Sequence, residues 1–221
     1  MPNIALRELA LTRSRVYDFL GSVYLKVPNP DLVERFMKEP SLPGEFHGMA
    51  MLREFFTRNR GKTPQELQES LALEHSRLLS GISYGYGPPP PYESVWIGQG
   101  RVMGASTVDV MKAYSEAGLE LVAKNREPPD HVGIELGFIS YLCRKEADAW
   151  TNDDFSETMK LLQMEQRFLT DHMQKWIPHL CEEIMNSDRT GFYHGIAMIT
   201  RECLANEDKA IEELLRTLTT A

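Results

Sequence analysis

The feature that most constrains this chain is the stretch at residues 130–150, which is apolar on nearly every side of a helix. Val132, Leu136 and Ile139 recur at helical spacing, and other apolar residues fill many of the positions between them. A helix that is hydrophobic all round must lie inside a protein. The remaining segments must therefore surround this one.

Helical periodicity also describes most of the other segments. A capping-box pattern of Thr63, Pro64 and Glu66 marks one helix start. The proline run 88–91 lies in the glycine-rich stretch 80–104, where it excludes both helix and central strand. We therefore expect an all-α fold in a single compact domain, residues 1–221. It should have about eight to twelve helices and a long Gly/Pro-rich loop or hinge near residues 80–104.

The expected boundaries follow from the apolar spacing and from breaking residues. Asp31 should cap a short second helix, and Ser106 with Asp109 should start a later one that ends before Pro128. Pro178 should kink a long helix. The expected helices cover residues 4–25, a short stretch after 31, 46–55, 64–78, 106–127, 130–150, 154–186, 190–205 and 207–219.

Bulk properties exclude several classes of protein. A formal charge of −8 argues against nucleic-acid binding, which needs concentrated lysine and arginine. No stretch reaches the roughly 18 to 20 apolar residues of a membrane span, and the N-terminus lacks the apolar core of a secretory signal. Cys143, Cys181 and Cys203 form no C-x-x-C pair, which fits a reducing compartment. We expect a cytoplasmic protein with no stable membrane insertion.

Signatures of catalysis or of a bound cofactor are missing from the sequence. The run GQGRVMG at 98–104 resembles a dinucleotide fingerprint, but its last spacing is one residue too long and no alternating strand and helix series follows. No P-loop, H-E-x-x-H or E-x-x-H pattern occurs. His131 and Glu135 alone are too few for a metal site. We therefore predict no catalytic residue, no metal and no cofactor.

Polar residues open the central helix, where burial is costly unless they find partners. Asp130, His131 and Glu135 occupy this position. In one interpretation Asp130 caps the helix and Glu135 pairs with His131 or with an arginine. In the other they form a polar recognition pocket. Gly133 and Gly137 predict that another backbone comes close to this helix.

Past the proline run, Tyr92 and Trp96 flank Glu93 and Ser94 on the predicted loop. Aromatic rings beside a carboxylate can hold an arginine through stacking and a charge-assisted hydrogen bond. The same rings can equally pin the loop to the core. The residues alone leave both interpretations open.

Several short stretches of the sequence form an ordered combination. They are EPPDH (127–131) with EL (135–136) and Phe138, PYESVW (91–96), FL (168–169) with His172, WIP (176–178), and the weaker LEHSRL (73–78) and VYDFL (16–20) with Pro28. Taken together, these stretches resemble the TorD/DmsD-type redox-enzyme maturation chaperones of molybdoenzymes. The resemblance extends from about residue 15 to residue 178, is specific as an ordered combination, and departs at Gly133, Gly137 and Ile139.

The resemblance implies a cytoplasmic all-helical chaperone that binds the N-terminal, often twin-arginine, signal region of a molybdopterin-containing oxidoreductase catalytic subunit until its cofactor is inserted. A receptor for arginines followed by an apolar run needs carboxylates beside an apolar groove. We expect Asp130 or Glu93 to pair with a signal arginine. The implied binding residues are Tyr92, Glu93, Ser94, Trp96, Asp130, His131, Glu135, His172 and Trp176.

Three questions stay open at this stage. The same pocket could serve a nucleotide- or molybdenum-cofactor-binding accessory protein, and a helical scaffold protein without a signal-peptide role is a third interpretation. Members of the family exchange segments between subunits, so a monomer and a domain-swapped homodimer, hinged at residues 80–104, are equally open.

Overall fold

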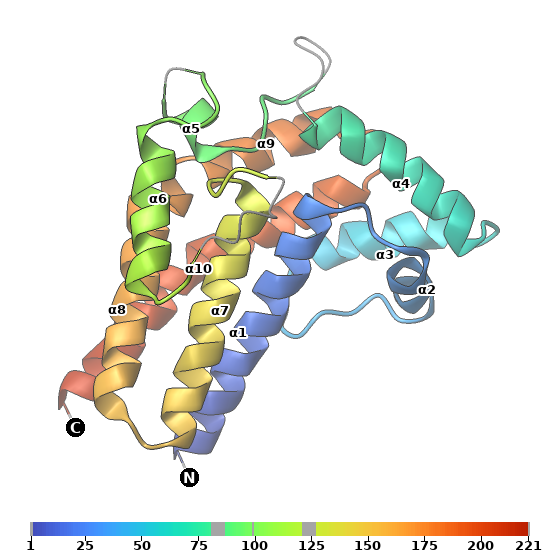
Figure 1. The fold of residues 1–221 in the computed structure, drawn as a ribbon. Helices are drawn as coiled ribbons and strands as arrows, with labels where there is room; N and C mark the ends of the chain where they lie inside the picture. The colour runs from blue at the N-terminus through green and yellow to red at the C-terminus, as the bar shows by residue number, and fades with distance from the viewer. Residues whose placement is uncertain (1, 81–86, 99, 121–126, 221) are drawn as a thin grey trace.

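The predicted central helix is present as α7 (Val132–Thr151), which packs side by side with α1 (Pro2–Leu25) in the computed structural model (Figure 1). Two further helices, α8 (Phe155–Asp171) and α10 (Phe192–Thr220), complete the bundle around it. The structure describes residues 2–80, 87–98, 100–120 and 127–220. Within α7, thirteen positions are buried, as a helix that is apolar on nearly every side requires.

The remaining helices lie on two sides of this bundle (Figure 1). On one side are α2 (Pro30–Lys38), α3 (Gly48–Arg58) and α4 (Pro64–Leu79), and on the other α5 (Glu93–Trp96) and α6 (Ala105–Glu116). A 3-10 turn, η1 (Met173–Lys175), and α9 (Ile177–Ser187) connect α8 to the rest. The described residues thus form ten α-helices and no strand, which confirms the all-α prediction.

A close contact between α1 and α7 depends on glycine. A Cβ at Gly133 would lie 2.5 Å from Leu25 Cγ and 2.7 Å from the Gly21 carbonyl oxygen, distances too short for carbon atoms. The predicted close approach is therefore present at Gly133. At Gly137 the backbone nitrogen would lie 3.3 Å from a Cβ at Gly21, but a Cβ at Gly137 itself would meet no atom within 4 Å.

Three helix boundaries differ from the sequence predictions. Asn29, and not Asp31, caps α2, because its side chain accepts from the Leu32 N–H. α6 begins at Ala105 with no side-chain cap and ends at Glu116. α10 runs unbroken through residues 205–207, where two helices were expected. No proline or glycine interrupts this stretch, so nothing forces a break.

The expected long helix over 154–186 is also divided, and Pro178 does not merely kink it. α8 ends at Asp171, η1 follows, and α9 begins with Pro178 at its second position. A proline ring clashes with the carbonyl four residues earlier, so a helix cannot run through residues 174–178. This break sets His172 and Trp176 at a bend. The predicted loop near 80–104 contains the short helix α5, while residues 81–86 and 99 of the predicted hinge lie outside the described residues.

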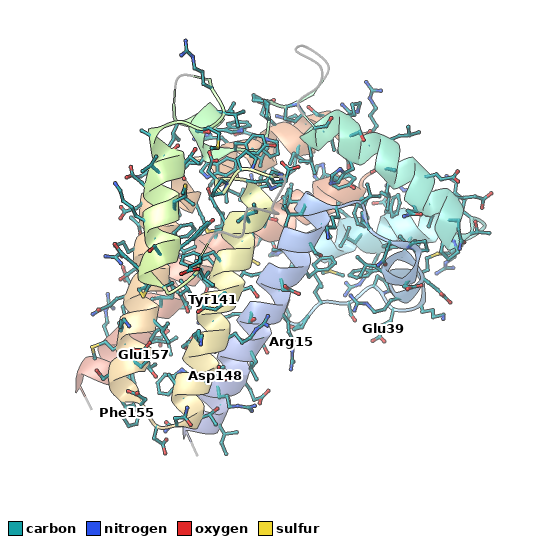
Figure 2. The ribbon with its side chains drawn as sticks, in the orientation of Figure 1. Arg15, Glu39, Tyr141, Asp148, Phe155 and Glu157 are labelled. Carbon is teal, nitrogen blue, oxygen red and sulfur yellow. The ribbon has the colours of Figure 1, made fainter. Side chains whose placement is uncertain are left out.

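Charged side chains such as Arg15, Glu39 and Asp148 lie on the surface (Figure 2), whereas Arg13 is buried. The Arg13 guanidinium pairs with Glu146 on α7, Glu165 on α8 and Glu207 on α10. Burial raises the pKa of Glu165 to about 8 despite this arginine. Cys143, Glu146 and Glu165 are close enough to share an ion. Arg13 already binds the Glu146 and Glu165 carboxylates. Through its three ion pairs the cluster joins α1, α7, α8 and α10.

Candidate functional site

The two motifs that the sequence placed in one pocket, residues 91–96 and 127–131, are held together by backbone hydrogen bonds. The Glu93 N–H donates to the Asp130 carbonyl at 2.9 Å, and the Val132 N–H donates to the Pro91 carbonyl at 3.0 Å. Between these bonds Tyr92 and His131 form an isolated antiparallel bridge. The start of α7 and the loop before α6 therefore form one structural unit.

Aromatic contacts pin the loop to this unit. The Tyr92 hydroxyl donates to Glu127 Oε2 at 2.6 Å, and its ring meets the His131 ring edge to face. The half-buried Trp96 donates from Nε1 to the Pro90 carbonyl at 3.0 Å. Its ring centroid lies 6.5 Å from that of Trp176. Of the two interpretations of Tyr92 and Trp96, these contacts favour the anchoring one.

His131, and not Asp130, caps α7. Its Nδ1 accepts from the Gly133 N–H at 3.0 Å, which requires a neutral imidazole, and burial lowers its pKa to about 4. Asp130 is fully buried and its Oδ2 accepts from the Ser94 N–H at 2.9 Å. The interpretation of Asp130 as the α7 cap is therefore wrong: its carboxylate holds the start of α5.

Behind this unit lies a buried pair of carboxyl groups. Glu93 accepts from His172 Nδ1, with 3.0 Å between Oε2 and the ring nitrogen. Glu135 Oε2 accepts from the Trp176 indole N–H at 3.1 Å. Burial raises the pKa of Glu135 well above its usual range, and the Glu93 carboxylate raises it further. The expected pairing of Glu135 with His131 or an arginine is therefore wrong.

A cavity of about 600 Å³ opens beside Glu93. Of the predicted residues, Glu93, Ser94 and His172 line it, whereas the other six lie outside its lining. Arg101 and Lys175 also line the cavity, as do the exposed apolar side chains of Ile97, Val102 and Met103.

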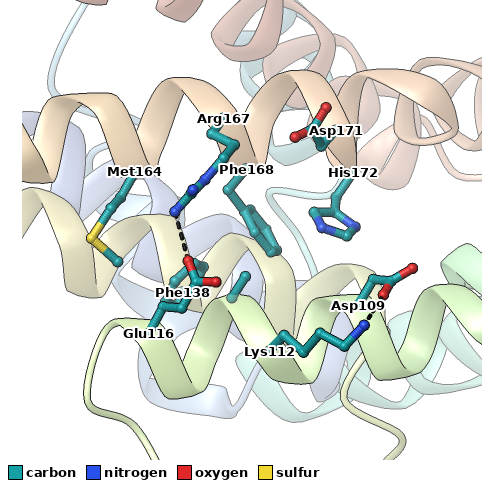
Figure 3. Close-up of a pocket in the computed structure, with 10 residues that line it drawn as sticks. Asp109, Lys112, Glu116, Phe138, Met164, Arg167, Phe168, Asp171 and His172 are labelled. Atoms are coloured by element: carbon teal, nitrogen blue, oxygen red, sulfur yellow. Dashed lines mark hydrogen bonds and ion pairs between the residues drawn. The ribbon is translucent and has the colours of Figure 1, made fainter.

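A smaller cavity of about 180 Å³ continues from the first one between α6 and α8 (Figure 3). The two cavities share Asp109, Asp171 and His172. Phe138 and Phe168 line the smaller one. Of the predicted site residues, His172 lines this smaller cavity, and sequence reasoning missed the rest of it; residues of the glycine-rich stretch 98–104 line the larger cavity instead.

Three buried acceptor atoms at the site have no hydrogen-bond partner among the described residues. These are Ser94 Oγ, Asp130 Oδ1 and Glu135 Oε1. Leaving a buried polar group unpaired costs about 1–3 kcal/mol, so an unpaired cluster calls for a functional reason. Their chemistry suits a guest that brings N–H donors and positive charge.

The sequence is similar to a known protein family and to several named proteins. A family described as the nitrate reductase delta subunit matches residues 39–182. A chaperone protein TorD of Vibrio cholerae is 24% identical over 219 residues and covers 96% of this chain and 97% of its own length. A protein of Haemophilus influenzae named as a probable Tat proofreading chaperone DmsD is 24% identical, with 62% of this chain and 60% of its own length covered.

A solved structure shares the fold. The crystal structure of a redox enzyme maturation protein from Archaeoglobus fulgidus matches with a TM-score of 0.50 and 20% identity, covering 87% of this chain and 93% of that chain. Among the described residues, no helix has the length and hydropathy needed to span a bilayer.

Proposed function

Because the chain belongs to the nitrate reductase delta subunit family as a chaperone of the TorD and DmsD type, we propose that it binds the N-terminal signal segment of a molybdopterin oxidoreductase. The observation that carries this proposal is the buried Glu93 carboxylate at the wall of the larger cavity, beside acceptor atoms that lack partners. An arginine of the twin-arginine signal supplies the matching charge and donors.

The charges at the cavity wall support an arginine in particular. A guanidinium presents several N–H donors in a fixed fork and stays charged at every physiological pH. Glu93 lies at the wall with Ser94 beside it, and the unpaired Ser94 Oγ can accept one of these N–H groups. We assign the arginine contact to Glu93. Asp130, which bonds the Ser94 N–H, is assigned to positioning the loop.

The apolar part of a signal segment also finds a matching surface. Ile97, Val102 and Met103 are each more than two-fifths exposed and line the same cavity. Met103 adopts a φ of 66°, a backbone conformation that non-glycine residues rarely take and that often marks a functional site. We assign the apolar run that follows the arginines to these side chains.

Peptide binding tests the proposal. We expect Glu93→Gln to weaken a fluorescent twin-arginine peptide about tenfold to a hundredfold, because a charge-assisted hydrogen bond contributes roughly 1.5–3 kcal/mol. Glu157→Gln is the matched control, since this side chain pairs with Lys160 on α8 away from the cavity. Equal affinities of wild type and Glu93→Gln in fluorescence anisotropy would remove Glu93 from the role.

We further propose that binding occurs in the cytoplasm and delays export until the client's molybdenum cofactor is inserted. The support is the family membership together with the TorD and DmsD relatives. Purification from native cells followed by mass spectrometry should recover an oxidoreductase catalytic subunit that retains its signal segment. Recovery of other proteins only would contradict this client class.

One observation favours a second candidate function, binding of a nucleotide or of the molybdenum cofactor. The N-terminus of α6 has no side-chain cap, and Ser106 Oγ and Thr107 Oγ1 lack partners among the described residues. Arg101 and Lys175 line the same cavity. Such a helix start attracts phosphate. Equilibrium dialysis with GTP and with a molybdopterin precursor tests this candidate: retention by wild type that is lost in Lys175→Gln supports it.

A further inference from the structure

The Glu93 and Glu135 carboxyl groups form a site where protonation and the binding of a cationic guest are coupled. Glu93 comes from α5 and Glu135 from α7, and both are almost fully buried. Both Glu93 oxygens lie within 3.2 Å of His172 Nδ1, while Glu135 accepts from the indole of Trp176 and lies against the Glu93 carboxyl group. Its second oxygen, Oε1, has no hydrogen-bond partner among the described residues.

The groups that face Glu135 offer it no full positive charge. Glu93 faces it from α5 and Asp130 from the segment before α7, and both disfavour a second negative charge. The buried Tyr114 phenol of α6 is also near enough to feel Glu135, and burial raises its pKa in the same direction. In the described part of the chain, no lysine or arginine forms an ion pair with Glu93, Asp130 or Glu135. In the described residues the basic side chain that contacts this pair is His172, which reaches Glu93 and not Glu135, so the two buried carboxyl groups cannot both ionise cheaply.

We propose that Glu135 carries a proton in the empty site and loses it to solvent when a guest guanidinium docks against Glu93, so that guest binding is coupled to proton release. This inference rests on the proposed function, because the guest is the arginine of the signal segment. It adds that pH controls the affinity of this site for the signal segment.

The charge balance of the step explains the coupling. Before binding, the site holds the Glu93 carboxylate and the neutral Glu135 carboxyl group. The guanidinium brings one positive charge, which stabilises a carboxylate at Glu135, and the displaced proton passes to the buffer. Trp176 Nε1 donates to Glu135 Oε2, and this bond can persist in both states. Linkage then requires affinity to rise with pH as long as the empty site is protonated.

Isothermal titration calorimetry measures the released protons directly. A synthetic peptide with two adjacent arginines followed by an apolar run is titrated at pH 7 in buffers of different ionisation enthalpy. We expect wild type to release protons as the peptide binds, up to one for each peptide, and Glu135→Gln to release almost none. Glutamine keeps an oxygen for the Trp176 indole and mimics the protonated carboxyl group. The exposed Glu54→Gln is the control and should release as many protons as wild type.

A second measurement needs no variant. The affinity of wild type should rise with pH, by up to about tenfold per pH unit, between the pKa of Glu135 in the complex and its pKa in the empty site. Tight binding with no proton release, or with an affinity independent of pH, would overturn the coupling but leave the proposed function intact. Equal proton release by Glu135→Gln would overturn the role of this residue. No peptide binding at any pH would contradict the proposed function itself.

Discussion

At the scale of single residues, the neutral imidazole of His131 makes stability depend on pH. Its pKa is about 4 in the folded protein and about 6.5 in an unfolded chain. Between these values the unfolded chain binds a proton that the folded protein does not, so stability falls as the pH falls. We expect a loss of about 2 kcal/mol from this residue between pH 7 and pH 4.5.

The substitution His131→Asn tests this expectation. Asparagine is a good helix N-cap and can still accept from the Gly133 N–H, but it does not titrate. Urea denaturation at both pH values should show a smaller acid-induced loss for His131→Asn than for wild type. The exposed His179→Asn is the control and should behave as wild type. If all three proteins lose the same stability, His131 is not a source of the pH dependence.

The residue types predicted where the polar site lies better than they predicted which hydrogen bonds its side chains form. The sequence placed Asp130, His131 and Glu135 at the start of a buried helix, which the structure confirms. It could not tell that His131 caps α7 while Asp130 bonds Ser94, because this depends on a backbone pairing with residues 91–93. Such partners are distant in sequence, and capping preferences describe only local bonds.

At the scale of helices, the crossing of α1 and α7 predicts opposite effects for two glycines on one helix. Gly133→Ala would push a methyl group into Leu25 and the Gly21 carbonyl, so we expect it to destabilise the fold by about 1–3 kcal/mol. Gly137→Ala meets no atom within 4 Å and should stabilise it by up to about 1 kcal/mol. Equal effects in urea denaturation would contradict the close crossing at Gly133.

Helix existence was predictable from periodicity, and helix ends were less so. The capping box of Thr63 and Glu66 was recognisable because all its bonds are local. The full break around His172 and the continuity of α10 were not predicted, although Pro178 favours the first and the absence of proline and glycine at 205–207 favours the second. Glu207, for example, lies where a break was expected, yet it is buried and paired with Arg13 of α1. A charged residue within an apolar pattern suggests a position on the protein surface, unless its buried partner is known.

At the scale of the molecule, two polar clusters lie at separate places in the bundle. The Arg13 cluster joins α1, α7, α8 and α10 and leaves each carboxylate paired with the guanidinium. The cluster at Glu93 and Glu135 has no such cation among the described residues and borders a cavity. Composition and the charge of −8 could not separate these two roles. The difference lies in how the fold distributes cations.

The most direct test of the central claim is where an arginine-bearing guest attaches. A twin-arginine peptide with a photo-crosslinking residue next to the arginines is irradiated with the protein, and the adducts are mapped by mass spectrometry. We predict adducts within residues 93–98, 101–109 and 171–175. Adducts confined to a separate cavity, which Arg15 and Arg35 line between α1 and α2, would contradict the claim.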